Sequence, residues 1–179
     1  MNQKTDVVEM EDTMFDDEDN SQEDKYLLFK LGNEEYGVSI YKIQSIEELH
    51  KIIAVPDMPE YVKGVINLRG KVIPVLSLRL RFGLEEKEYD DRTCIIILNV
   101  DASTMGLIVD TVSEVHEIPK TNIEPAPDFS QNGGKDRYIQ GLGKIEDEIK
   151  ILLDVGKIIL DDEIDMITTT ADVNGEIEE

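Results

Sequence analysis

The sequence is short of the residues that crosslink chains, bind metals or stack on bases. It has one cysteine (Cys94), two histidines and no tryptophan, which excludes an intrachain disulfide framework and a four-cysteine zinc site. Aromatic residues make up 6% of the chain, too few for the stacking platforms that bind single-stranded nucleic acid. The apolar runs fall short of the roughly 18 residues that cross a bilayer, and the first residues do not resemble a secretory signal. We therefore expect an intracellular protein that inserts into no membrane.

Basic residues are also scarce, and the excess acid is unevenly placed. Lysine and arginine number 18 against 40 acids, a net charge of −22, so the basic face that nucleic-acid binding requires is not expected. Residues 1–24 have a net charge of −9 and residues 161–179 one of −8, which leaves −5 for residues 25–160. Self-repelling segments with little apolar content do not pack. We predict a disordered acidic tail over 1–24, a folded domain over 25–160, and a helix end with a second acidic tail over 161–179.

Short apolar runs separated by turn residues fill the segment 25–160, a pattern typical of all-β proteins. Two stretches are predicted to be helical: residues 77–82, and a helix that begins at Val155 and continues towards Ile167. Hairpin turns are expected at Gly32-Asn33, at Arg69-Gly70 and within 101–104. The expected strands are 26–31, 35–40, 64–68, 71–78, 93–100, 105–109 and 150–155.

The folded segment contains an internal repeat. Residues in 37–56 match residues 69 positions later, and residues in 61–78 match residues 77 positions later. The difference of eight is an insertion in the loop around 131–135. A unit of about 65–70 residues made of short strands suits a small five-stranded barrel. We predict two barrels, with repeat halves of about 25–92 and 93–160; the repeat does not decide which strands the barrels exchange. The aligned pairs include Gly37 with Gly106, Ile46 with Val115, Tyr61 with Tyr138 and Gly64 with Gly141.

The motifs of catalysis and of cofactor binding are missing from the sequence. His50 and His116 are isolated, and no Gly-x-Ser-x-Gly elbow, His-x-x-x-His pair or phosphate-binding glycine loop occurs. Asp110 and Asp154 each end an apolar strand, where capping of the following turn is expected. We expect no catalytic residue, no metal ligand and no cofactor. An enzyme that uses a cleft between the barrels is the remote alternative.

One strand should lie in the interior. The run CIIIL at 94–98 does not alternate between apolar and polar residues, so we expect it to be covered on both faces, at the seam between the barrels. Cys94 is then expected to be a buried small hydrophobic residue rather than a reactive thiol.

The most distinctive stretch for binding is 56–83, which places Arg69 at a predicted hairpin tip. Followed by Gly70, this arginine can project a planar fork of donors towards a partner's carboxylate. The second repeat has Glu146-Asp147 where the first has Arg69-Gly70. The barrel architecture therefore does not require a cation at this turn, and both a solvated arginine and a partner-binding one stay open.

Six motifs follow one another along the folded segment. They are YGV at 36–38, GVINLRG at 64–70, VIPVLSLR at 72–79, MGLIVD at 105–110, RYIQGLGKI at 137–145 and ILLDVGKII at 151–159. In this order they closely resemble the CheW family, the adaptors that couple bacterial chemoreceptors to the histidine kinase CheA. The resemblance covers essentially residues 25–160.

This resemblance implies a fold and a role. The fold is all-β, two intertwined five-stranded SH3-like β-barrels with a short C-terminal helix. The role is a non-enzymatic scaffold that binds the cytoplasmic tip of a chemoreceptor and the regulatory domain of CheA, in the cytoplasm at receptor arrays on the inner membrane face. An adaptor of another sensory array with the same fold, or a fragment of a CheV protein or of CheA, is the alternative.

The resemblance also points to candidate partner-binding residues. Ile43 stands at an apolar position that affects receptor coupling in the family, and Gly64 stands at a glycine that is sensitive to substitution. The NLRG motif begins at Asn67 and supplies Arg69. The candidates are Ile43, Ser45, Gly64, Asn67 and Arg69.

Ser45 is a departure from the family pattern. Family members commonly have a glutamate at this position, and it is able to pair with the NLRG arginine. Here Glu47 and Glu48 lie nearby in the sequence, and either is a candidate to take its place.

Overall fold

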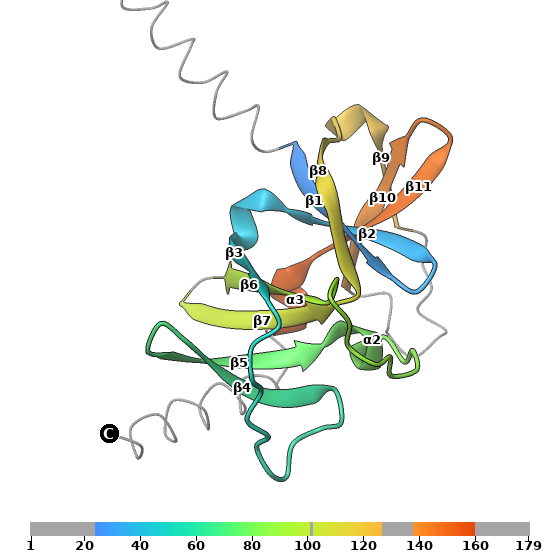
Figure 1. Ribbon diagram of the computed structural model, residues 1–179. Helices are drawn as coiled ribbons and strands as arrows, with labels where there is room; N and C mark the ends of the chain where they lie inside the picture. The colour runs from blue at the N-terminus through green and yellow to red at the C-terminus, as the bar shows by residue number, and fades with distance from the viewer. Residues whose placement is uncertain (1–23, 101, 127–137, 160–179) are drawn as a thin grey trace, which may run out of the picture.

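The computed structural model describes residues 24–100, 102–126 and 138–159 (Figure 1). The strands in these ranges are β1 (Lys25–Leu31), β2 (Glu34–Ser39), β3 (Ile43–Glu48), β4 (Val62–Leu68), β5 (Lys71–Ser77), β6 (Cys94–Val100), β7 (Ser103–Val109), β8 (Thr111–Glu117), β9 (Ile123–Pro125), β10 (Ile139–Ile145) and β11 (Glu148–Leu153). The helices are α2 (Leu78–Arg81) and α3 (Val155–Ile159), with short 3₁₀ turns η1 (Ile40–Lys42) and η2 (Lys120–Asn122). The predicted acidic tails (Asp24 excepted), the loop around 131–135 and any helix beyond Ile159 lie outside the described residues.

Every strand expected from the sequence is present, with its ends within two residues of the expected positions. Both helices also begin where expected: Ser77 caps α2 by accepting a hydrogen bond from the Leu80 amide, and α3 begins at Val155. Asp154 caps α3, since its carboxylate accepts from the Lys157 amide at 3.4 Å.

Four strands were missed, namely β3, β8, β9 and β10. β3 and β8 are half-exposed along most of their length, so their sequences (IQSIEE and TVSEVHE) show little apolar clustering. β9 has three residues and ends in a proline, whereas β10 contains Gly141 and Gly143, which lower β-propensity. These strands form because a neighbouring strand is available, rather than because of their own composition.

The strands form two sheets. The first sheet has the order β8-β1-β2-β11-β10-β9 and the second the order β3-β6-β7-β5-β4. The two orders correspond strand by strand under the sequence repeat. The short β9 adds a sixth strand to the first sheet, and in the second sheet its place is taken by an isolated bridge between Ile53 and Val65. The fold is the predicted pair of intertwined SH3-like barrels.

The structure decides which strands are exchanged. Hairpin β1–β2 lies in the first sheet, between β8 and β11, so in Figure 1 the blue strands sit among the yellow and orange ones. Hairpin β6–β7 lies in the second sheet, between β3 and β5. Each sheet thus combines strands from both sides of residue 92, and each exchanged hairpin makes one parallel pairing, β2 with β11 and β7 with β5.

Two glycines aligned by the repeat allow these parallel pairings. Gly37 is paired with Leu152, and Gly106 with Val75. A Cβ atom on Gly37 would lie 2.8 Å from the Leu152 side chain, and one on Gly106 would lie 2.8 Å from the Val75 side chain. The same close approach thus explains why glycine recurs after 69 residues.

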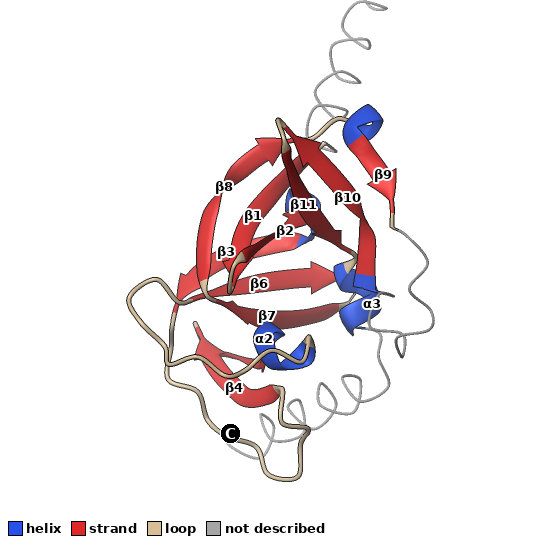
Figure 2. Cartoon of the chain, turned by 90° about the vertical axis from the view of Figure 1, so that its right-hand side faces the viewer, coloured by secondary structure: helices blue, strands red, loops and turns tan. Residues whose placement is uncertain are grey.

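The main core lies between the two sheets. Its buried strand residues come from β1, β2, β4, β5, β6, β7 and β11, and include Phe29, Leu98 and Leu107. The two helices close this core, since Leu78 of α2 and Ile158 of α3 are fully buried in it. Figure 2 shows both helices at the junction of the sheets, with α2 next to β7 and α3 close to β6.

Strand β6 is covered on both faces, as its sequence predicts. Ile96 and Leu98 belong to the core between the sheets, whereas Ile95 and Ile97 belong to the core of the second barrel. Cys94 departs from the prediction, because it is only partly buried. Its thiol donates to the Arg92 carbonyl at 3.2 Å, and burial raises the thiol pKa, so the group is not activated for nucleophilic chemistry.

Candidate functional site

The predicted partner-binding residues lie on the two outermost strands of the second sheet, β3 and β4, and at the tip of hairpin β4–β5. Three of them, together with Glu47, make up what we call the Arg69 surface: Ser45, Glu47, Asn67 and Arg69. The remaining two lie on the same two strands, with Ile43 partly buried on β3 and Gly64 buried on β4.

The turn at the hairpin tip is stabilised by its backbone conformation and by one side-chain hydrogen bond. Arg69 and Gly70 have φ angles of 53° and 86°, the left-handed pair that a tight two-residue hairpin turn requires. The Asn67 carboxamide oxygen accepts from the Gly70 amide at 2.9 Å and stabilises the turn. The Arg69 side chain is 81% exposed. Glu146, its repeat partner in hairpin β10–β11, has φ 56°, so the same turn carries an acid in the first sheet.

Glu47 is the acid that faces Arg69. Its carboxylate lies 3.7 Å from the Arg69 guanidinium, and its side chain is 16% exposed. The Ser45 hydroxyl, two residues earlier on the same face of β3, donates to the same Glu47 oxygen at 3.2 Å. Glu48 is exposed on the opposite face of β3. The acid next to Arg69 is therefore Glu47 rather than Glu48, and the Ser45 hydroxyl orients its carboxylate.

The Ile43 side chain is not exposed on the surface. It is partly buried, pairs with Leu98 of β6 and packs against the core between the sheets. The exposed large apolar residues close to Ile43 in the sequence are Tyr41, which is 51% exposed, and Ile46, which is 44% exposed. Val115, which the repeat aligns with Ile46, is 53% exposed on β8 of the first sheet.

Gly64 is a structural glycine. Its φ is 138°, and a Cβ atom there would lie 2.0 Å from the Ile53 carbonyl oxygen. The approach is this close because Ile53 and Val65 exchange backbone hydrogen bonds of 2.8 and 2.9 Å. Gly141 needs glycine only for close approach, since a Cβ there would lie 2.9 Å from the Glu124 carbonyl oxygen.

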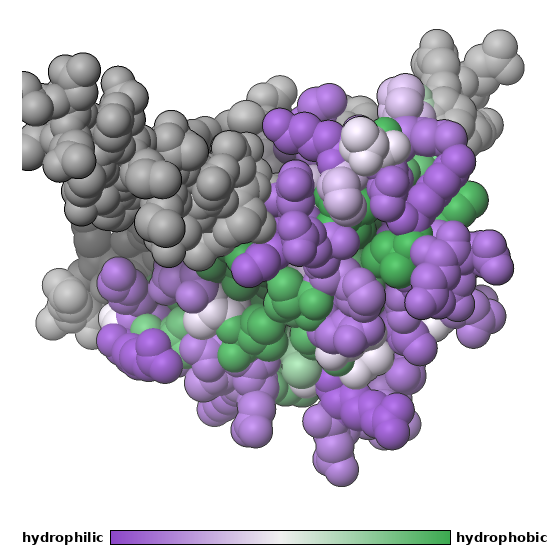
Figure 3. Space-filling model, turned by 90° about the horizontal axis from the view of Figure 1, so that it is seen from above, coloured by the Kyte–Doolittle hydropathy of each residue, from purple (hydrophilic) through white to green (hydrophobic). Residues whose placement is uncertain are grey.

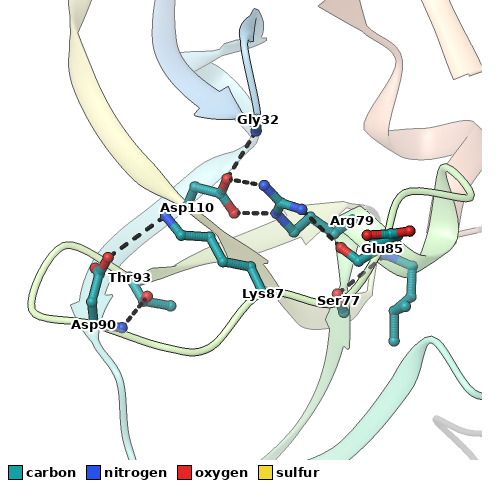
Figure 4. A network of polar contacts seen from close by, with 9 residues as sticks. Gly32, Ser77, Arg79, Glu85, Lys87, Asp90, Thr93 and Asp110 are labelled. Atoms are coloured by element: carbon teal, nitrogen blue, oxygen red, sulfur yellow. Dashed lines mark hydrogen bonds and ion pairs between the residues drawn. The ribbon is translucent and has the colours of Figure 1, made fainter.

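Sequence analysis missed an ion pair that joins the two sheets (Figure 4). The Arg79 Nε and Nη2 atoms donate to the two Asp110 carboxylate oxygens at 2.7 and 2.8 Å. Asp110 lies where the chain leaves β7 of the second sheet for β8 of the first. It also binds hairpin β1–β2: its carboxylate accepts from the Gly32 amide at 2.8 Å, and its amide donates to the Lys30 carbonyl at 3.2 Å.

The expectation that Asp110 caps the following turn is therefore wrong, because its carboxylate is taken by Arg79 and Gly32. Burial alone would raise its pKa, but the hydrogen bonds from Arg79 and Gly32 and the charges of Arg79 and Lys87 outweigh burial and lower it. The sequence signal was weak, because Asp110 directly follows β7 whereas Arg79 lies two residues after the end of β5.

A second contact between the sheets involves two tyrosines that the repeat aligns. The Arg81 guanidinium lies over the Tyr61 ring at 4.5 Å and over the Tyr138 ring at 4.8 Å. Tyr138 stacks on Phe82, which contacts Tyr36. Cation–π pairs of this kind stabilise by about 0.5–2 kcal/mol. The Arg81 side chain thus contacts the equivalent tyrosine of both repeats.

The larger exposed apolar side chains of the described residues come from several separate segments. On the face seen from above, apolar side chains (green) lie among hydrophilic ones (Figure 3). Within the described ranges, no group of three His, Cys, Asp or Glu side chains is arranged to hold a metal ion. No helix in the described part of the chain is long and apolar enough to cross a membrane.

Comparisons with known proteins agree with this geometry. The CheW-like domain model matches residues 25–163. The chain belongs to the CheW family. Chemotaxis protein CheW of Klebsiella aerogenes is 35% identical over 147 residues, 82% of this chain and 88% of that protein. Chemotaxis protein CheW of Helicobacter pylori is 34% identical over 145 residues, 81% of this chain and 87% of that protein.

A solved CheW structure has the same fold. The scaffolding protein TtCheW of Thermoanaerobacter tengcongensis aligns with a TM-score of 0.71 at 32% identity, over 78% of this chain and 94% of that one. The resemblance found in the sequence motifs is thus confirmed, and with it the role of a chemotaxis scaffold.

Proposed function

We propose that this CheW-family protein is a non-catalytic scaffold that binds the cytoplasmic tip of a chemoreceptor and the regulatory domain of the kinase CheA at the same time. The protein would act in the cytoplasm, at receptor arrays on the inner membrane face.

One observation carries the proposal. The two sheets have the same strand order, but their equivalent hairpin tips carry opposite charge, Arg69-Gly70-Lys71 in one and Glu146-Asp147-Glu148 in the other. One backbone design therefore presents two chemically different surfaces, as a protein that joins two different partners requires. Electrostatic complementarity mainly sets which partner each surface accepts.

Within the proposed site, we assign partner contact to Ser45, Asn67 and Arg69, and a shaping role to Ile43 and Gly64. Glu47 holds the guanidinium near the surface of the strand, so that its remaining donors can form a two-pronged pair with a partner's carboxylate.

Titration of the full-length protein against a receptor fragment and against the CheA regulatory domain, separately and together, tests the proposal. Arg69→Ala should weaken at least one of the two affinities tenfold or more, because losing a desolvated charge pair at an interface typically costs 2–5 kcal/mol. Arg69→Lys should restore it only in part, since an ammonium lacks the planar fork. Lys71→Ala, on the same hairpin, is the matched control and should have a small effect.

Two results would contradict the proposal. If the wild-type protein binds receptor and kinase only in competition, it is not a scaffold that joins them. If both affinities of Arg69→Ala equal those of wild type, the Arg69 surface is not a partner site.

A further inference from the structure

Residues 83–92, here called the strap, connect α2 to β6. All of them are exposed. Its larger apolar side chains, Leu84 and Tyr89, are 38% and 37% exposed. Exposed loops outside the buried core open at a free energy below that of global unfolding.

Polar contacts fasten the strap at both ends. Near its start, the Leu84 amide donates to the Arg79 carbonyl at 2.8 Å, and the Arg79 Nη1 donates to the Glu85 carbonyl at 2.8 Å. The Lys63 ammonium of β4 pairs with Glu86. Near its end, the Asp90 amide donates to the Thr93 hydroxyl at 2.9 Å.

A small hollow lies between the middle of the strap and the sheet below. It has a volume of about 10 Å³ and is lined by Lys87 and Tyr89 of the strap and by Ser77, Ile108 and Val109 of β5 and β7. Such a volume has room for about one water molecule.

Arg79 contacts both the strap and Asp110. Its Nη1 donates to the Glu85 carbonyl of the strap, while its Nε and Nη2 donate to the Asp110 carboxylate. The same carboxylate accepts from the Gly32 amide at the tip of hairpin β1–β2. Figure 4 shows these contacts meeting on one guanidinium. The hairpin belongs to the first sheet and the strap covers the second, so one side chain joins parts of both.

We propose that Arg79 makes the strap and the tip of hairpin β1–β2 a single opening unit, so that the two segments open and close together while both sheets stay folded. A bound partner that shifts the strap would then change the exposure of the hairpin tip on the other sheet. This coupling is distinct from the proposed scaffold function and does not depend on it.

Native-state hydrogen exchange of the full-length protein tests the coupling, with the Gly32 amide reporting on the hairpin tip, the Leu84 amide on the strap, and the β6 amides on the sheets. Asp110→Asn removes the ion pair and keeps the side-chain size. It should raise exchange of the Leu84 amide at least tenfold, although Asp110 does not contact the strap amide, and leave β6 within twofold.

Lys63→Gln is the reverse experiment. It loosens the strap at Glu86, and it should raise exchange of the Gly32 amide by about threefold, the size expected for an exposed ion pair. Lys144→Gln breaks a comparable surface pair with Glu124 in the first sheet and should leave both amides unchanged.

The proposal is overturned if Lys63→Gln accelerates only the strap, or if Asp110→Asn accelerates only Gly32, because the two segments then open independently. It is also overturned if β6 accelerates equally, since the pair then supports the whole fold. Should Asp110→Asn not fold, Arg79→Lys, which keeps the charge and loses the fork, takes its place with the same criteria.

Discussion

The two sheets repeat one backbone plan, but they differ in side-chain chemistry at equivalent places. Hairpin tips β4–β5 and β10–β11 make the same turn, with φ 53° at Arg69 and 56° at Glu146, yet one is basic and the other acidic. The fold constrains the backbone at this turn and leaves the charge free. Positions where the two repeats differ are therefore the ones to examine for partner specificity.

A second difference concerns the points where the chain passes from one sheet to the other. At the passage from β7 to β8, Asp110 is bound by Arg79 and by hairpin β1–β2. The repeat places Tyr41 and Gly156 at the equivalent positions, which cannot form this ion pair. The passage from β2 to β3 therefore folds without it, so Arg79 and Asp110 add a constraint that the repeat itself does not need.

The largest expected effect comes from separating the repeats. Neither 1–88 nor 89–179 expressed alone should fold, because each sheet takes a hairpin from the other side of the cut. Expressed together, the fragments should form a 1:1 complex with the circular dichroism spectrum of the intact protein. Size-exclusion chromatography with light scattering measures this. A folded single fragment would mean that the barrels are not interdependent.

The two glycines at the entry to β4 and β10 should differ in sensitivity. Gly64→Ala should destabilise by about 3–4 kcal/mol, because a positive φ adds to a backbone clash. Gly141→Ala should cost about 1–2 kcal/mol, since only the close approach is lost. Denaturant unfolding of both variants gives the difference. Equal values would show that the positive φ at Gly64 adds no strain.

Asp110 should give the protein an acid-sensitive component of stability. Its pKa is lowered in the folded state, so its contribution is present above its ordinary pKa of 3.8 and is lost as pH falls through the lower folded value. Between about pH 5 and pH 2, wild type should lose more unfolding free energy than Asp110→Asn. Parallel pH curves for the two proteins would show that this carboxylate is not held in its charged form.

The smallest expected effect is on stability at the Arg69 surface. Arg69→Ala and Glu47→Gln should each change the unfolding free energy by less than about 1 kcal/mol, because the arginine is exposed and its ion pair is screened. Glu146→Ala at the equivalent tip should behave alike. Thermal unfolding measures all three. A loss above about 2 kcal/mol for Arg69→Ala alone would make the cation part of the fold.

Local pattern and repetition were enough to predict much of this protein. Apolar runs and turn residues predicted β1, β2, β4, β5, β6, β7 and β11, and the repeat predicted two barrels. Motif order indicated the family. The repeat aligned Gly64 with Gly141, and the close approach of a neighbouring backbone requires glycine at both positions.

Other features depended on contacts between residues far apart in the sequence. The strands β3, β8, β9 and β10 form because a neighbour supplies hydrogen-bonding partners. The choice of Glu47 over Glu48 depended on which face of β3 turns towards Arg69, and the burial of Ile43 depended on its pairing with β6. None of these is a property of the residue's own segment.

The sequence by itself determined the strands with strong apolar patterns, the repeat and the family, because these depend on residue types at fixed short spacings. Only the tertiary structure decided that each sheet takes its central hairpin from the other half and that Arg79 meets Asp110, 31 residues away, and Asp110 meets Gly32, 78 residues away. A hairpin can pair with either of two similar sheets at nearly the same local energy. The choice depends on how the side chains of both sheets pack together in the core between them.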